Sequence, residues 1–160
     1  MRLYRKFFQR IGHMRWFAVF GRYVFPRIDR LMHRLTRGRL FPTGTVAPVL
    51  LLTTRGRRSG RFRTTPVIYI RDGERFVVTS QDLGSASRRA AWPLNLDVNS
   101  EAQVTIGSEV IACHARRVSD AEAIRYWPRL VEVWPAHETY LERSGRRHTF
   151  LLEPLPSATN

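Results

Sequence analysis

The residues whose types and spacing are best suited to chemistry lie between positions 53 and 69, TTRGRRSGRFRTTPVIY. We call residues 55–63 the arginine hairpin. Guanidinium groups bind phosphate and carboxylate in bidentate fashion, and a glycine at a turn lets backbone N–H groups approach an anion. The pattern predicts an anion-binding hairpin, with an exposed turn of solvated arginines as the alternative. The candidate binding residues are Arg57, Arg58, Ser59, Gly60 and Arg63, and Arg61 stands among them in the sequence.

The remaining sequence lacks the arrangements of the common catalytic classes. Its five histidines show no metal-ligand spacing, and Cys113 is the single cysteine, so we expect no metal site. There is no G-x-S-x-G elbow, no G-x-G-x-x-G and no Walker loop. An enzyme without nucleophile, metal or evident acid–base pair is one whose cofactor carries the chemistry.

Several short patterns follow one another along residues 48–154. The first is G-R-R-S-G-x-x-R-x-x-P-x-x-Y at residues 56–69, and W-x-L-N-L at residues 92–96 comes next. The stretch 99–104, N-S-E-A-Q-V, precedes Tyr126-Trp127-Pro128 and Tyr140. In this order and spacing they resemble the signature of the deazaflavin (coenzyme F420)-dependent nitroreductase and quinone-reductase family.

The resemblance implies an α+β fold, a split β-barrel of the flavin-reductase type, that holds coenzyme F420. It implies that the arginine hairpin binds the phosphate and oligoglutamate tail of the cofactor, through Arg57, Arg58, Ser59, Gly60 and Arg63. A second set would line the ring and ribityl region: Pro66, Ser80, Ala91, Trp92 and Asn95. Ordinary core packing remains the alternative for Trp92, and capping of a turn for Asn95.

The reaction that the resemblance implies is hydride transfer from reduced F420 to a quinone, a nitroaromatic or a similar electrophile. Trp134, His137 and Tyr140 stand where the family places the tyrosines that cover the substrate, and only Tyr140 is kept. Tyr140, His137 or water could deliver the proton, and the sequence does not choose. The family's Ser-Lys-Gly-Gly loop is replaced by Ser80-Gln81-Asp82-Leu83, which removes one tail contact and adds repulsion at Asp82.

Other functional classes stay open from the sequence. A split barrel that binds flavin mononucleotide or haem is the nearest enzymatic rival. A basic membrane- or nucleic-acid-binding module without catalysis is the rival of a different class. We expect no nucleic-acid partner, because no such motif is present and the N-terminal aromatics lie on an apolar helix face.

The elements expected to position these residues are mostly short strands. Alternating or continuous apolar runs predict strands at 49–54, 63–70, 75–80, 102–106, 109–118 and 149–153. Pro66 indicates a sheet edge or a bulge, and Asp72-Gly73 a hairpin turn. A short helix is expected at 88–98, and a second begins at the capping box of residues 119–122 and is interrupted at Pro128 and Pro135.

Charge divides the chain into two parts. Residues 1–63 carry 16 of the 27 Lys and Arg and a single acid, Asp29, whereas residues 64–160 are nearly neutral. We expect residues 1–42 to form a basic amphipathic helical arm and residues 43–160 to form the barrel domain. The arm either packs on the barrel or lies, through residues 1–39, on an anionic membrane surface.

A chain of 160 residues fits one domain with its own core. The longest uncharged run, residues 40–54, contains two prolines, so we expect no transmembrane helix, and we expect no signal peptide. The resulting expectation is a cytoplasmic protein, or one held peripherally at the inner face of the cell membrane. Its partner is a small-molecule electron acceptor, and its expected state is a monomer or a homodimer.

Overall fold

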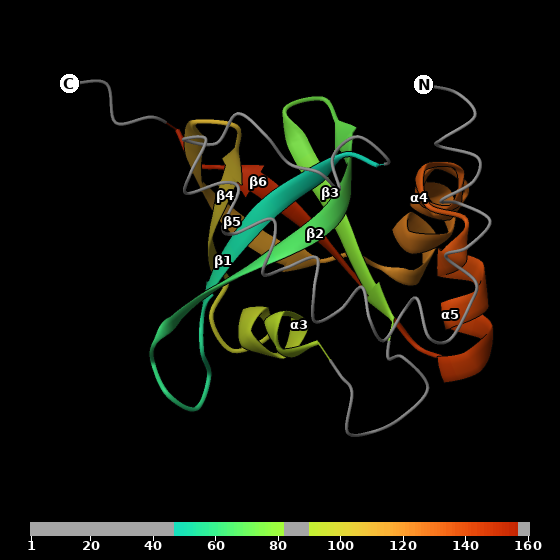
Figure 1. The fold of residues 1–160 in the computed structure, drawn as a ribbon, viewed down its shortest axis with the longest axis horizontal. Helices are drawn as coiled ribbons and strands as arrows, with labels where there is room; N and C mark the ends of the chain where they lie inside the picture. Colours follow the sequence, from blue (N-terminus) through green and yellow to red (C-terminus); the bar gives the residue numbers. More distant parts are fainter. Residues whose placement is uncertain (1–46, 82–89, 157–160) are drawn as a thin grey trace.

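The computed structural model describes residues 47–81 and 90–156 of the chain, and the predicted arm and the loop around Asp82 lie outside them. The described part is a six-stranded barrel with three helices (Figure 1). The strands are β1 (Val49–Arg55), β2 (Phe62–Asp72), β3 (Arg75–Gln81), β4 (Glu101–Ile106), β5 (Glu109–Arg117) and β6 (Arg147–Pro154). The helices are α3 (Ala91–Leu96), α4 (Asp120–Val133) and α5 (Ala136–Ser144).

The strands close into one antiparallel barrel in the order β1-β2-β3-β6-β5-β4, because β4 also pairs with β1. Strand β6, which follows the other strands in the chain, lies between β3 and β5. This architecture confirms the predicted α+β split barrel with helical decoration.

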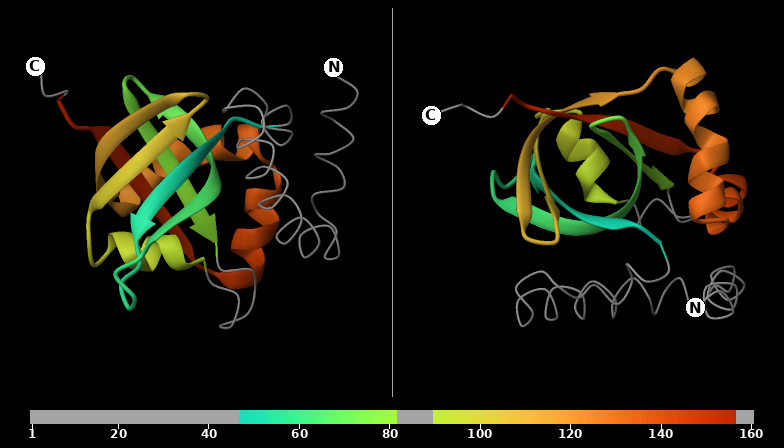
Figure 2. Two further views of the ribbon diagram at one scale, coloured as in Figure 1. Left: turned by 60° about the vertical axis from the view of Figure 1, so that its left-hand side comes forward. Right: turned by 90° about the horizontal axis from the view of Figure 1, so that it is seen from above.

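The alternation of side chains along the strands builds two apolar layers. Inside the barrel, Leu50, Phe76 and Phe150 are fully or almost fully buried, and Trp92 and Leu96 of α3 join the same cluster. Helix α3 therefore closes one end of the barrel, as the view from above shows (Figure 2). On the outer surface, Val77 of β3 and Leu151 of β6 pack against residues of α4.

Strands β2 and β3 diverge beyond Tyr69 and Val78, the last pair of their ladder toward the arginine hairpin. Within the described residues, the first part of β2, residues 62–68, has a ladder partner only in β1, and residues 79–81 only in β6. We call this divergence the β2–β3 fork. Pro66 lies in it, which confirms the predicted edge, and the β1–β2 register runs on without a bulge.

Helix α4 confirms one prediction and corrects another. Ser119 and Glu122 form the predicted capping box. The helix then continues through Pro128 to Val133, so the predicted interruption at Pro128 is wrong. Proline has no N–H to donate to the carbonyl of the fourth residue before it, here Ile124. Ile124 is 65% exposed, so its carbonyl can bond to water instead. The break before α5 falls at Pro135, as predicted.

Candidate active site

Two glycines shape the turn of the arginine hairpin. Gly60 has a φ of 65°, which confirms the expected positive φ, and its N–H donates to the Gly56 carbonyl at 2.8 Å. Gly56 donates to the Arg61 carbonyl at 2.9 Å. A Cβ added at Gly56 would lie 2.8 Å from the Ser59 hydroxyl oxygen and 3.1 Å from that same carbonyl. The close approach of the chain to itself therefore requires glycine at position 56.

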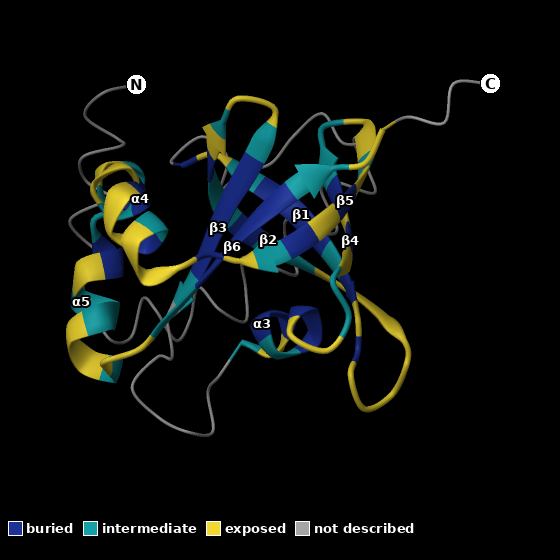
Figure 3. Cartoon of the chain, turned by 180° about the vertical axis from the view of Figure 1, so that it is seen from behind, coloured by how far each residue is buried: buried dark blue, intermediate teal, exposed yellow. Residues whose placement is uncertain are grey.

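The arginines of this turn are exposed, and the turn is coloured as exposed in Figure 3. No acidic residue occurs between Ala47 and Arg71. Among the residues that the structure describes, no ion pair involves Arg57, Arg58 or Arg63. Their charge is therefore not neutralised by a described carboxylate and can bind an anion.

Asn95 joins α3 to this hairpin. Its side chain is only 3% exposed. Its amide nitrogen donates to the Thr54 hydroxyl at 3.1 Å, and its amide oxygen accepts the Arg57 backbone N–H at 3.1 Å. The predicted cofactor residue thus holds Arg57 in place, a role that the sequence could not show because 38 positions separate the two residues.

The other two predicted residues of α3 differ in exposure. The Trp92 indole is 4% exposed and packs edge-on against Phe150, with 5.7 Å between ring centroids. Its core packing, the alternative reading of the sequence, is therefore part of its role. Ala91 precedes it at the start of the helix and is exposed.

Pro66 and Ser80 flank the β2–β3 fork from opposite strands. Both are partly exposed. Ser80 is paired with His148 across the β3–β6 ladder. Here the two strands leave their shared ladder, so within the described residues neither edge pairs with the other beyond Tyr69 and Val78.

The third group of predicted residues lies on the segment from the end of α4 into α5, which packs beside β3 (Figure 1). His137 is 5% exposed, and burial lowers its pKa from 6.5 to about 4, so its imidazole is neutral near pH 7. Tyr140 is partly exposed, and burial raises the pKa of its hydroxyl, although Arg143 opposes this. Trp134 ends α4 and is also partly exposed.

These three groups lie toward the same end of the barrel. Figure 1 shows the arginine hairpin at one side of this end, α3 beneath the middle of the barrel, and α5 beside β3 at the other side. Among the described residues, no three His, Cys, Asp or Glu side chains gather where they could hold a metal ion. The chemistry available is therefore anion binding by arginine and proton donation by a tyrosine hydroxyl.

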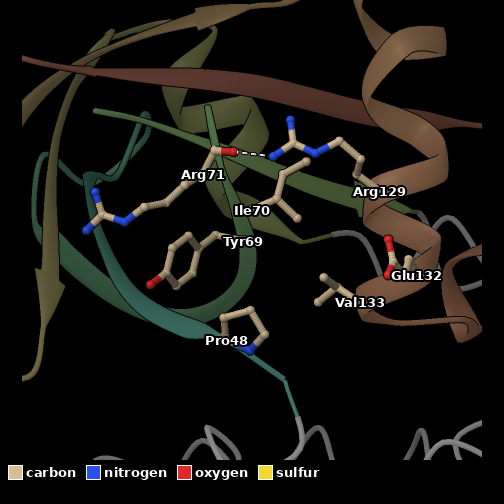
Figure 4. Close-up of a pocket in the computed structure, with 7 residues that line it drawn as sticks. All are labelled: Pro48, Tyr69, Ile70, Arg71, Arg129, Glu132 and Val133. Atoms are coloured by element: carbon tan, nitrogen blue, oxygen red, sulfur yellow. Dashed lines mark hydrogen bonds between the residues drawn. The ribbon is translucent and has the colours of Figure 1, made fainter. Parts of the chain in front are cut away.

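A pocket of about 390 Å³ lies elsewhere, between β2 and α4 (Figure 4). Ile70, Val133 and Pro48 line it, and Arg129 crosses it to donate to the Arg71 carbonyl. It contains none of the predicted site residues, and no sequence pattern indicated it. It lies toward the far end of β2, away from the arginine hairpin.

The fold defines a class of protein, the small split barrels with helical decoration, and this one presents a cluster of exposed arginines at one hairpin. Residues 25–153 match the family model described as F420H(2)-dependent quinone reductase. The chain belongs to this family, and it is an oxidoreductase that uses coenzyme F420. No helix of the described residues is long and apolar enough to cross a membrane.

Relatives and solved structures agree with this assignment. The chain is 36% identical over 87 residues to an F420H(2)-dependent quinone reductase of Mycobacterium tuberculosis strain H37Rv, covering 54% of this chain and 72% of the relative. A second such reductase of that strain is 29% identical over 104 residues, 63% of this chain and 69% of the relative.

A solved F420-H2 dependent reductase, FDR-A, superposes with a TM-score of 0.59 at 25% identity, over 66% of this chain and 94% of that one. A haem-binding protein of Mycobacterium smegmatis shares the fold alone, with a TM-score of 0.52 at 19% identity over 68% of this chain and 47% of that one.

Proposed function

We propose that this chain transfers a hydride from reduced coenzyme F420 to a quinone, with nitroaromatics as further acceptors, at the end of the barrel where the fork, α3 and α5 lie. The observation that carries the proposal is the arginine hairpin, whose cations pair with no described carboxylate and stand on a turn that Asn95 fixes to α3. When bound, reduced F420 supplies the hydride, and the protein supplies orientation and a dry site.

The arginine hairpin suits the anionic part of the cofactor. Arg57, Arg58 and Arg63 would bind its phosphate and carboxylates through charge-assisted bonds. Ser59 adds a hydroxyl, and Gly60 allows the backbone to come close. The described chain offers these guanidinium groups no carboxylate of its own, which supports their binding of an external anion.

The ring of the cofactor would lie at the β2–β3 fork. A deazaflavin ring has a polar edge that needs hydrogen-bond partners and apolar faces that need contact. At the fork, β2 and β3 have no ladder partner in each other within the described residues, and Pro66, Ser80 and Ala91 lie around it. Trp92 and Asn95 act from beneath, because both are buried and hold α3 in position.

Tyr140 is the better proton donor of the two candidates on α5. A tyrosine hydroxyl is protonated at neutral pH, burial raises its pKa further, and the residue is partly exposed. His137 is neutral and buried, so it has no imidazolium proton to give. We expect Tyr140→Phe to lower kcat by about a hundredfold if Tyr140 is the general acid. An unchanged kcat would assign the proton to water.

The deciding experiment compares three arginines of one hairpin. Arg58→Ala and Arg63→Ala should each weaken F420 binding by roughly 1.5–3 kcal/mol, measured by fluorescence quenching, because each removes a charge-assisted bond. Arg61→Ala is the matched control. It lies in the same turn, outside the family pattern, and its backbone bonds survive truncation. Thermal stability should stay unchanged, because exposed arginines contribute little to it.

Two outcomes would contradict the proposal. Equal losses for all three variants would mean that the hairpin attracts anions by net charge alone. Flavin mononucleotide bound as tightly as F420 would mean that the arginines do not serve a longer anionic tail.

We also propose that residues 1–39 hold the enzyme at an anionic membrane surface. The sequence places eleven basic residues there, together with an apolar helix face. Each basic residue near such a surface contributes about 1 kcal/mol. A lipid-soluble quinone would then be met where the enzyme is held. The oligomeric state, a monomer or a homodimer, stays a prediction.

A further inference from the structure

Helix α3 cannot owe its position to its own stability. It has six residues, Pro93 among them, and no side chain caps its N-terminus. Helices of this length are unstable in isolation, so tertiary contacts must hold it. Yet it carries Ala91, Trp92 and Asn95, three of the residues assigned to the cofactor site. Whatever holds α3 therefore sets the geometry of the floor of the site.

Three side-chain contacts tie α3 to three different strands. Asn95 bonds to Thr54 at the end of β1 and to the arginine hairpin. Trp92 packs on Phe150 of β6. The third contact is an ion pair between Asp97, the C-cap of α3, and Arg117 at the end of β5.

Arg117 holds Asp97 through two nitrogens of its guanidinium group, Nη2 and Nε. Its Nη2 lies 2.7 Å from Oδ2 and 2.9 Å from Oδ1 of Asp97, and its Nε lies 3.1 Å from Oδ1. The planar guanidinium fork matches a carboxylate in this way, and an ammonium group cannot. The pair therefore fixes the direction of the helix end as well as its distance from β5.

The same guanidinium group reaches two further neighbours of the site. Its Nη1 lies 3.2 Å from Nδ1 of His148, the ladder partner of Ser80. Its Cζ lies 4.8 Å from the ring centroid of Phe150, on which Trp92 packs. Arg117 thus contacts the helix end and the direct neighbours of two residues assigned to the cofactor.

We propose that Arg117 is a positioning residue for the cofactor site, which sets the placement of α3 relative to Ser80 without touching the cofactor itself. The inference rests on the proposed function of this end of the barrel. It goes beyond the arginine hairpin, because Arg117 lies on a different strand and outside the patterns that carry the family resemblance.

The preceding residue provides a matched control. Arg116 forms an equally well-aligned pair with Glu122, at 2.7 and 3.0 Å, and has a similar exposure. This pair ties β5 to the start of α4, on the other side of the strand and away from α3. Loss of either pair should cost a similar, small amount of stability, but only one pair holds the cofactor site.

The experiment measures F420 affinity and thermal midpoint for Arg117→Gln, Asp97→Asn and Arg116→Gln in the full chain. Arg117→Gln and Asp97→Asn should each raise the Kd for F420 by about fivefold, and the double variant should raise it no further, because both remove one interaction. Arg116→Gln should leave the Kd unchanged. Arg117→Lys should restore the affinity only in part, because it keeps the charge and loses the fork.

The Kd and kcat should separate in the Arg117→Gln variant, with kcat at saturating F420 changed less than the Kd, since α5 is untouched.

Equal Kd values for the Arg116 and Arg117 variants would overturn the inference. If Arg117→Gln fails to fold, Asp97→Asn decides the matter alone. If the unmodified chain does not bind F420, the proposed function falls as well. If it binds F420 and Arg63→Ala weakens the binding while Arg117→Gln does not, only this inference falls.

Discussion

His137 and Tyr140 keep their neutral forms for the same physical reason, since burial penalises the charged state of each. The consequences are opposite. Neutrality leaves Tyr140 with a proton to donate and leaves His137 without one. The sequence placed both residues on one helix but could not separate them, because their burial depends on packing between α4, α5 and β3.

Burial of His137 makes the stability of the fold depend on pH. The unfolded chain binds a proton at this histidine below about pH 6.5, whereas the folded chain resists it until about pH 4. Stability is therefore fully present above pH 6.5 and falls as the pH drops toward 4, by up to about 3 kcal/mol. Urea titrations between pH 5 and 7 should show this slope.

The matched variant for that measurement is His137→Gln, which is neutral at every pH. Its free energy of unfolding should lose most of the slope between pH 5 and 7. Glu122 does not interfere in this range, because Arg116 and the Ser119 backbone hold its pKa at about 2. A slope that survives in His137→Gln would mean that another group titrates.

Among the elements, the arginine hairpin shows how much of the site could be predicted from the sequence. Its turn was predictable because glycine, serine and arginine act locally, and Gly60 adopts the expected conformation. The hydrogen bond that fixes the base of the hairpin to α3 was not predictable, because Asn95 and Thr54 are 41 positions apart. The same limit applies to Arg117 and Asp97, which are 20 positions apart and meet only when the barrel closes.

Gly56→Ala tests whether the hairpin geometry matters for binding. The added methyl group would meet the Arg61 carbonyl, a backbone atom that cannot swing aside. The turn must therefore shift, and we expect F420 affinity to fall by about tenfold, with a stability loss of about 1–3 kcal/mol. Gly73→Ala is a useful comparison, since it strains another hairpin turn of the barrel, with a φ of 62°, and should leave affinity unchanged. Equal effects on affinity would show that general destabilisation is the cause.

For the whole molecule, the uneven charge of the chain is the feature that calls for a partner. Residues 64–160 are nearly neutral, so almost all of the positive charge lies in residues 1–63, which include the arginine hairpin. Composition predicted this asymmetry, because it follows from residue types, whereas the split-barrel fold was predicted from the family resemblance. The position of the predicted arm relative to the barrel depends on interactions that composition does not contain.

Deleting residues 1–39 tests the membrane proposal. The intact chain should sediment with anionic liposomes and not with zwitterionic ones, and added salt should weaken the binding. The shortened chain should lose this binding and still reduce a soluble acceptor. An intact chain that ignores anionic liposomes at low salt would contradict the proposal. A shortened chain that aggregates would place the arm in the core.

The position of β6 in the barrel has a consequence for how the protein is made. Residues 147–154 are translated after every other strand, yet they fill the space between β3 and β5. Until they leave the ribosome, both of those strands present unpaired edges, and each can pair with another chain. Strand β6 is also far from β3 in the sequence, since Thr79 bonds to Thr149 across this pair. Pairing of β6 into the barrel is therefore slow compared with the formation of local hairpins. The nascent chain therefore needs protection until its C-terminal strand emerges, and chains that stall before residue 147 should be aggregation-prone.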